Sequence, residues 1–386
     1  MHVLFDYQAY LLQSHGGITR CFTELIRHFP NDISVQIAIK ESNNIYLNEN
    51  HLVENLQPLY RTRETFLGGV NNKYKEFLFN SLNYIPFVHT SKKENRKFCI
   101  NLLKQGNFDV FHPTFFDPYF LPYLQNRPFV LTIHDLICLR IMPHVDNLQC
   151  KENLYYLANK AAHIVAVSQH TKQDIIELLN IPSECISVIY HGAPDVDIAM
   201  VRQQPRLINT PYLLYVGARN VAYKNFIPFI KQTAGFLHTH PKIHVVCTGL
   251  PFTQDEYHLF VSLGIEKQMI HVFASSQELY NLYNNAEVFI FPSSYEGFGI
   301  PILEAFACEC PVLLNHASCL PEIASNAALY FHMPQEIDYQ FVLNQFWEHR
   351  TENRQDLIRK GREQLQRYSW ATSALQLSTI YKRIIS

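Results

Sequence analysis

The stretch that decides the fold is residues 287–305, Glu-Val-Phe-Ile-Phe-Pro-Ser-Ser-Tyr-Glu-Gly-Phe-Gly-Ile-Pro-Ile-Leu-Glu-Ala. Its first half is an apolar run typical of a buried strand, and a glycine-containing turn and a helical pattern follow. Pro301 has a fixed φ and no N–H, so it suits the first helical turn and predicts a helix that begins near Ile300.

Two glutamates flank the start of this helix. Glu296 lies in the predicted turn, and Glu304 lies about one turn into the helix, roughly 5 Å along its axis. The free N–H groups of the first turn and the positive end of the helix dipole form a phosphate site. We therefore expect the two carboxylates to reach hydroxyl groups on either side of a bound diphosphate. A solvated helix face is the alternative that two spaced glutamates alone would indicate.

Composition limits the class of protein. The chain has 386 residues, 47% of them hydrophobic and 17% charged, which predicts two domains with large cores. Its net charge of −2 gives no reason to propose nucleic acid as a partner. It opens without a basic segment and has no run of about 18 apolar residues, so neither a signal peptide nor a membrane span is predicted.

The nine cysteines show no Cys-x-x-Cys pair, which favours reduced thiols and a cytoplasmic location. Ordinary core or surface cysteines are the preferred interpretation. A metal site built on Cys308, Cys310 and Cys319 is the alternative.

Short apolar runs alternate with helical patterns, which predicts parallel sheets built from βα units. In the first half the predicted strands are Val3–Phe5, Val110–His112, Phe129–His134, Ile164–Val167 and Ile186–Tyr190. In the second half they are Tyr212–Val216, Ile243–Cys247, Met269–Phe273, Val288–Phe291 and Val312–Leu314. The predicted helices include Ile18–Phe29, Thr171–Leu179, Phe226–Leu237 and Gln277–Asn284.

A polar stretch, residues 193–211, has three prolines and no periodicity, and we interpret it as an interdomain linker. The prediction is an α/β protein with two Rossmann-like domains, residues 1–195 and 196–368, followed by an amphipathic terminal helix over 369–386. Ligands in such sheets bind beyond the carboxyl ends of the strands, so the site is expected in a cleft between the two halves.

Three further strings follow predicted strands. Gly16 and Gly17 open a helix, where the missing Cβ lets backbone approach a phosphate or a sugar. Arg219 and Lys224 follow the strand at 212–216, and two cations there suit a diphosphate. His134 ends the strand at 129–134. The alternative for the glycine pair is an ordinary turn, and the alternative for Arg219 and Lys224 is a solvated pair of cations. For His134 it is a structural histidine whose hydrogen bonds are satisfied.

These strings together resemble the retaining glycosyltransferases of family 4, which have the GT-B fold. The resemblance rests on Glu-x7-Glu after an apolar strand, Gly-Gly-Ile-Thr-Arg at 16–20 and Tyr-Lys-Asn-Phe at 223–226, and it covers essentially the whole chain. It implies transfer of a hexose from a nucleotide-sugar donor, GDP-mannose or similar, to a glycan or lipid-linked glycan in bacterial surface-polysaccharide synthesis. It also implies that the terminal helix crosses back to the N-terminal domain, with packing on the second domain as the alternative.

The resemblance assigns roles residue by residue. Glu296 would hold sugar hydroxyls, with a nucleophilic role as the alternative, Glu304 would hold the ribose, and His134 would lie near the anomeric carbon. Groups on the diphosphate would be Gly16, Gly17, Arg219, Lys224 and the N–H groups of Phe298, Gly299 and Ile300. Backbone of Val272 and Phe273 would contact the base. Scaffold positions between the domains would be Ser168, Thr171, Lys172, His191 and Gly192.

No cofactor and no metal ion is expected, because the one Asp-x-Asp string, at 195–197, lies in the linker. Residues 61–104 carry nine basic and three acidic side chains with interleaved aromatics, a pattern of helices that lie on anionic membranes. An ordinary solvated face is the alternative there.

Three other functions compete: a sugar-nucleotide epimerase, a phosphorylase, and a non-catalytic sugar-nucleotide-binding subunit. The first two need added acid–base carboxylates or a pyridoxal phosphate lysine, and neither signature appears.

Overall fold

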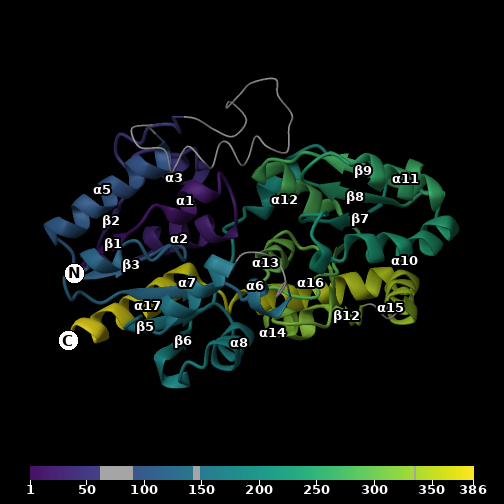
Figure 1. The fold of residues 1–386 in the computed structure, drawn as a ribbon. Coiled ribbons are helices and arrows are strands. Elements are labelled where there is room, and N and C mark those ends of the chain that lie inside the picture. The colour runs from purple at the N-terminus through teal and green to yellow at the C-terminus, as the bar shows by residue number, and fades with distance from the viewer. Residues whose placement is uncertain (61–89, 142–147, 334–335) are drawn as a thin grey trace.

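The computed structural model describes residues 1–60, 90–141, 148–333 and 336–386. They form two α/β halves that lie side by side, each built on parallel strands (Figure 1). This confirms the predicted fold class. The domain boundaries at 195 and 368 stay predictions.

The N-terminal half contains six parallel strands in two groups, ordered β2-β1-β3 and β4-β5-β6. A single bridge between Phe111 and Phe129 joins the groups. The strands are β1 (His2–Phe5), β2 (Ser34–Ile37), β3 (Val110–His112), β4 (Val130–Ile133), β5 (His163–Ala166) and β6 (Ile186–Val188). The helices are α1 (Gln8–Leu12), α2 (Gly17–Arg27), α3 (Ile45–Glu49), α5 (Ser91–Gln105), α6 (Ile137–Arg140), α7 (Leu148–Ala158) and α8 (Gln169–Leu179).

The C-terminal half contains one six-stranded parallel sheet with the order β12-β11-β10-β7-β8-β9. Its strands are β7 (Tyr212–Tyr215), β8 (His244–Thr248), β9 (Met269–Val272), β10 (Val288–Phe291), β11 (Val312–Asn315) and β12 (Leu329–Phe331). The helices are α9 (Ile198–Gln203), α10 (Phe226–Thr239), α11 (Gln254–Ser262), α12 (Ser276–Asn285), α13 (Ile300–Ala307), α14 (Leu320–Ala324), α15 (Glu336–Glu348) and α16 (Arg350–Leu365).

The central strands are apolar on both faces because helices cover both sides of a parallel sheet. In β7, Leu213 belongs to one hydrophobic cluster and Leu214 to another, as the alternation of side chains along a strand requires. The carboxyl ends of the strands therefore stay the positions where polar side chains collect.

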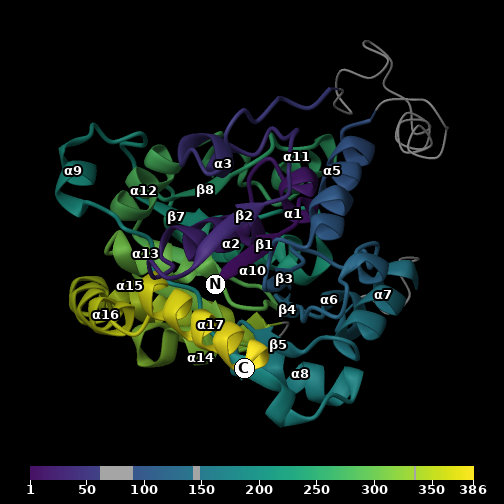
Figure 2. The same cartoon turned by 90° about the vertical axis from the view of Figure 1, so that its left-hand side faces the viewer.

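The terminal helix α17 (Trp370–Ile385) crosses back to the N-terminal half, as Figure 2 shows. Trp370, Leu377 and Tyr381 are part of the core of that half. The Tyr381 hydroxyl and Nδ1 of His112 are 2.5 Å apart, and Lys382 pairs with Asp32 at 2.6 Å. The crossing that the resemblance implied is confirmed.

Two strands were missed by the sequence patterns. β2 has the sequence Ser-Val-Gln-Ile, whose polar residues interrupt the apolar run that marks the other strands. β12 has only three residues and does not stand out from the apolar residues before it. The predicted linker also contains a helix, α9, whose start is capped by the Asp197 side chain, which accepts from the N–H groups of Ala199 and Met200.

The proposed membrane face at 61–104 lies partly outside the described residues. Of its described part, 91–104 belongs to α5, which buries Asn95, Cys99 and Leu103 against the N-terminal half. Among the described helices, none combines the length and apolarity that a membrane span requires.

Two buried histidines predict loss of stability in acid. Burial lowers the pKa of His112 to about 3 and that of His163 to about 4, whereas an unfolded imidazole has a pKa of about 6.5. Below pH 6.5 the unfolded chain therefore binds more protons, and each histidine lowers the free energy of unfolding by up to about 1.4 kcal/mol per pH unit as the pH falls toward its folded-state pKa.

We expect His163→Gln to lower the number of protons taken up on unfolding between pH 6 and 4.5 by about one. The free energy of unfolding would then fall less steeply with pH, as measured by urea unfolding. An unchanged slope would show that His163 titrates normally in the folded protein.

Candidate active site

Two helix N-termini meet at the interface between the halves. Gly299 precedes α13 with φ of +97°, a left-handed conformation that favours glycine, and it offers no side chain to cap the helix. Gly16 precedes α2 with an extended backbone, and it likewise offers no side chain to cap its helix. A Cβ placed on Gly17 would lie 3.5 Å from Cδ1 of Ile300. The two glycine strings therefore lie together, and the positive ends of two helix dipoles are close to one another.

Lys224 and Glu296 form an ion pair beside this point. Lys224 Nζ lies 2.5 Å from Glu296 Oε1, and the two side chains are 17% and 13% exposed. Asn225, in the left-handed region, fixes the turn by donating from Nδ2 to the Pro292 carbonyl at 2.9 Å and to Ser294 Oγ at 2.5 Å. The structure thus brings together a cation and a carboxylate that lie 72 positions apart in the sequence.

Glu304 pairs with a residue from the other half, Arg20 on α2. Arg20 Nη1 contacts Glu304 Oε1, and Nη2 donates to the Tyr280 hydroxyl at 3.2 Å. The Arg20 and Glu304 side chains are 18% and 9% exposed. The sequence patterns assigned no role to Arg20. Its place one turn after Gly16 and Gly17 was the available signal, since that spacing puts it on the same helix tip.

The turn that carries Glu296 presses directly on the end of β4. A Cβ placed on Gly297 would lie 1.7 Å from the carbonyl oxygen of His134. The Gly297 carbonyl accepts from Ser168 Oγ at 2.7 Å and from Thr171 Oγ1 at 3.2 Å. Ser168 and Thr171 therefore connect the halves, as the scaffold interpretation predicted.

His134 lies between Phe22 and His191, with ring centroids 5.5 and 5.8 Å away. Its Nε2 is buried without a hydrogen-bond partner among the described residues. Burial lowers the pKa of His134 to about 4, so the ring is neutral at neutral pH. Burial also raises the pKa of the adjacent Asp135 carboxyl, and the Glu296 charge adds to that rise.

The Arg219 side chain contacts the end of β8 and the start of α11. Its Nε donates to Glu256 Oε1 at 2.8 Å, and Nη1 donates to the Thr248 carbonyl at 3.1 Å. Its side chain is 5% exposed. The structure therefore gives Arg219 a role in holding α11 to β8, and its place on a diphosphate stays a prediction.

The two residues predicted at the base lie at the end of β9. Val272 is half-buried and Phe273 is 79% exposed. Their contact with a nucleobase stays a prediction.

Two family models match the chain, one in each half. Residues 15–195 match Glycosyltransferase Family 4, and residues 198–364 match Glycosyl transferases group 1. Together the two matches cover most of the chain, which therefore belongs to the glycosyltransferases that these models describe. This confirms the resemblance seen in its motifs.

Curated relatives include two O-antigen enzymes. The chain is 28% identical over 228 residues to the O-antigen chain mannosyltransferase RfbU of Salmonella typhimurium, a match that covers 58% of the chain and 61% of that protein. It is 26% identical over 284 residues to the O-antigen chain mannosyltransferase B of Escherichia coli, covering 68% of the chain and 72% of that protein.

Solved structures support the same fold. Anabaena Alr3699/HepE in complex with UDP and glucose gives a TM-score of 0.71 at 15% identity, covering 98% of this chain and 99% of that chain. WaaG, a glycosyltransferase involved in lipopolysaccharide biosynthesis, gives 0.66 at 14% identity, covering 98% and 99%.

Proposed function

We propose that this chain is a retaining hexosyltransferase of bacterial surface-polysaccharide synthesis, with GDP-mannose or a similar nucleotide sugar as donor. The observation that carries the proposal is the Lys224–Glu296 pair beside the N-terminus of α13, with Glu304 inside the same helix. The O-antigen mannosyltransferases among the relatives support the mannose donor and the glycan or lipid-linked glycan acceptor.

In this proposal the two members of the pair contact the two sides of the bond that breaks. Glu296 accepts hydrogen bonds from sugar hydroxyls, and Lys224 contacts the diphosphate. Because Nζ and Oε1 are 2.5 Å apart, the sugar and its phosphate meet neighbouring groups, as a sugar phosphate requires. The N–H groups of Phe298, Gly299 and Ile300 complete the diphosphate site together with Gly16 and Gly17.

The reaction we propose is a front-face substitution. The bond between the anomeric carbon and the phosphate oxygen breaks, the acceptor oxygen bonds to the same face, and its proton passes to the leaving phosphate. Lys224 and the α13 dipole stabilise the negative charge that develops on the phosphate, which is electrostatic catalysis. Neutral His134 offers its unpaired Nε2 to a sugar hydroxyl. These positive groups make a catalytic metal ion unnecessary.

Glu304 and Arg20 complete the nucleotide site. When the donor binds, ribose hydroxyls replace the Arg20 guanidinium on Glu304. The long Arg20 side chain then lets the released guanidinium reach the diphosphate. All nine cysteines are free thiols, which supports the proposed cytoplasmic location.

Lys224→Met tests this function. We expect the rate constant for donor hydrolysis and for transfer to fall by about 100- to 1,000-fold, because a positive group on the leaving phosphate is lost while the side-chain length is kept. Exposed Lys231 on α10 provides the control Lys231→Met, which should keep wild-type rates. Background turnover in the wild type, unaltered by Lys224→Met or Arg219→Ala, would favour the non-catalytic binding subunit.

A further inference from the structure

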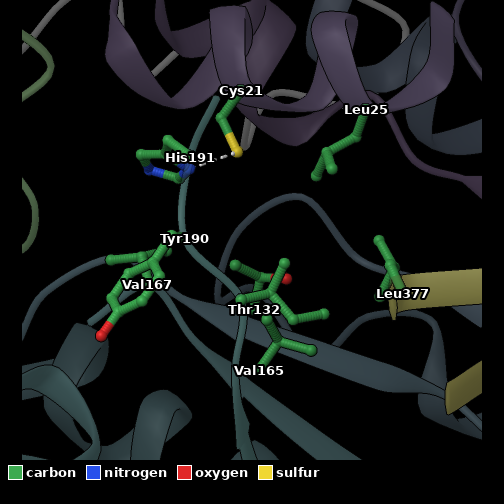
Figure 3. Close-up of a pocket in the computed structure, with 9 residues that line it drawn as sticks. Cys21, Leu25, Thr132, Val165, Val167, Tyr190, His191 and Leu377 are labelled. Carbon is green, nitrogen blue, oxygen red and sulfur yellow. Dashed lines mark hydrogen bonds between the residues drawn. The ribbon is translucent and has the colours of Figure 1, made fainter. Parts of the chain in front are cut away.

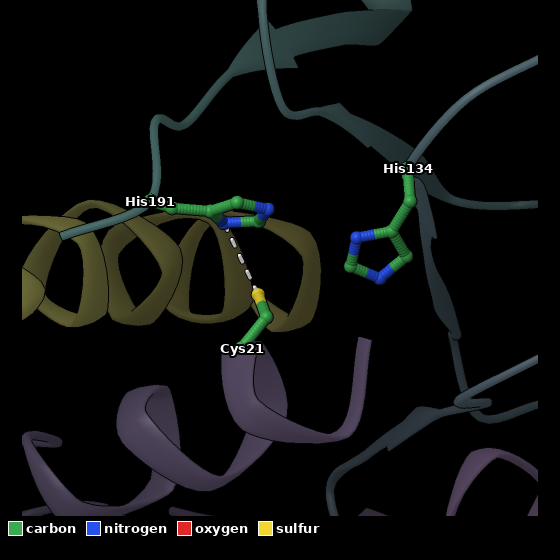
Figure 4. Close-up of side chains that lie close together, drawn as sticks. All are labelled: Cys21, His134 and His191. Atoms are coloured by element: carbon green, nitrogen blue, oxygen red, sulfur yellow. Dashed lines mark hydrogen bonds between the residues drawn. The ribbon is translucent and has the colours of Figure 1, made fainter. Parts of the chain in front are cut away.

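Three metal-ligating side chains converge where α2 meets the ends of two strands. Cys21 lies on α2, His134 follows β4 and His191 follows β6 (Figure 4). One ligand atom from each lies within 4.8 Å of the others. Cys21 Sγ and His191 Nδ1 are already 3.3 Å apart.

We propose that Cys21, His134 and His191 form a zinc-binding site that is separate from the diphosphate groups. One thiolate and two imidazoles are ligands that zinc prefers. Bond lengths of about 2.0 Å to nitrogen and 2.3 Å to sulfur place tetrahedral ligand atoms roughly 3.3 to 3.6 Å apart. The Cys21–His191 spacing meets this requirement, so the site needs an inward movement of about 1 Å by His134.

An independent observation points to a missing ligand at this place. His134 Nε2 is buried and has no hydrogen-bond partner among the described residues, which is unusual for a buried polar atom. An ion bound between the imidazoles would satisfy a ring nitrogen that the protein leaves unpaired.

The surroundings allow the small rearrangement. A cavity of about 10 Å³, room for roughly one water, lies beside Cys21 and His191 and is otherwise lined mainly by apolar side chains such as Leu25 and Val165 (Figure 3). This space lets the Cys21 thiol adjust its position without repacking the core. The His191 ring also packs on the rings of Phe298 and Trp370, with centroid distances of 4.6 and 5.6 Å. These contacts hold the orientation of the His191 ring.

The charge balance is simple. The Cys21 thiol releases one proton to solvent as sulfur bonds to Zn²⁺, and the two neutral imidazoles each donate a lone pair. A fourth position is left for a water molecule. Because the ligands come from one helix and two strand ends, the ion would also bind these elements together.

A consequence for activity rests on the proposed function. His134 cannot offer Nε2 to a sugar hydroxyl while that nitrogen is bound to zinc, so bound zinc should inhibit transfer. The site would then be an inhibitory zinc site beside the donor sugar.

The test uses the full chain, reduced and free of metal, titrated with Zn²⁺ and separately with Co²⁺. We expect one equivalent of zinc by equilibrium dialysis, and a thiolate-to-cobalt charge-transfer band in the absorption spectrum. Cys21→Ser should weaken zinc binding by more than about 100-fold and remove the band, because loss of a direct ligand exceeds the 10- to 100-fold cost of losing an outer-shell partner.

Cys99→Ser is the matched control, since Cys99 is a buried thiol in the same core but outside the cluster. It should keep the band and the stoichiometry. Should Cys21→Ser lose its folded circular dichroism spectrum, His191→Gln replaces it with the same expectation. Absence of zinc binding and of the band in the wild type, or equal binding in wild type and Cys21→Ser, would overturn the proposal. Zinc binding without inhibition would leave the site standing and contradict the role of His134 in transfer.

Discussion

Gly297→Ala is expected to remove nearly all transferase activity. The new Cβ would lie 1.7 Å from the His134 carbonyl oxygen and 2.8 Å from its carbonyl carbon, and both are backbone atoms that cannot rotate away. The turn must therefore move, and Glu296 moves with it. A displacement of about 1 Å at a reacting group costs on the order of 100-fold in rate. Steady-state kinetics of donor hydrolysis and transfer measure the effect, and wild-type kcat/KM in the variant would contradict it.

The matched control is Gly235→Ala on α10. A Cβ placed there meets nothing within 4 Å, and the position is exposed and helical. Alanine should keep full activity and raise the free energy of unfolding by about 0.4 to 1 kcal/mol, because glycine loses more backbone entropy on folding. The contrast between two Gly→Ala changes isolates the close approach of the halves.

Glu304→Gln is expected to impair both stability and nucleotide binding. The change leaves the Arg20 guanidinium without its counter-charge where both side chains are less than one-fifth exposed, at 18% and 9%. Removing one partner of such a pair lowers the free energy of unfolding by about 3 kcal/mol. Loss of a charged acceptor for ribose hydroxyls, about 1.5 to 3 kcal/mol, weakens nucleoside diphosphate binding by about 10- to 100-fold.

Chemical unfolding and calorimetric titration with UDP and GDP measure these two effects. Glu363→Gln is the control, because Glu363 pairs with Arg359 at 2.8 Å on α16 while the side chains are 62% and 58% exposed. That exposed pair should contribute less than about 1 kcal/mol and leave nucleotide affinity unchanged. Unaltered UDP and GDP affinity in Glu304→Gln would contradict the ribose assignment.

The fold was largely predictable because most of its strands are short, nearly continuous apolar runs that alternate with helical patterns. The helix start at Ile300 followed from Pro301, whose ring geometry is local. β2 was missed because polar residues interrupt its apolar run, and β12 was missed because its three residues do not stand out from the apolar residues before them. The helix α9 escaped because its cap at Asp197 was interpreted as part of a linker.

The candidate site was predictable only where a single segment carries it. Glu296 and Glu304 could be placed from one strand–turn–helix unit. Arg20 as the partner of Glu304, and Glu256 as the partner of Arg219, depend on contacts between segments far apart in the chain. Such contacts leave no mark in periodicity or spacing.

The cysteines illustrate the same limit. The alternative metal site placed Cys319 among its ligands, but Cys319 Sγ donates to the carbonyls of Glu296 and Phe298 at 3.1 and 3.2 Å and supports the turn instead. The cluster that does converge combines Cys21 with histidines more than 100 positions away. Sequence neighbours were therefore the wrong place to search.

The chain passes between the halves twice, and the two passages touch. The Ala193 N–H donates to the Tyr368 carbonyl at 3.1 Å, and Ser373 Oγ donates to the Tyr190 carbonyl at 2.6 Å. A Cβ on Gly192 would lie 2.3 Å from the Trp370 nitrogen, so the contact is tight. Two connections at one point act as a single pivot. Opening the enzyme to admit a donor should thus be a rotation of one half against the other about this pivot. The residues farthest from the pivot should move most, and the halves should slide little past each other.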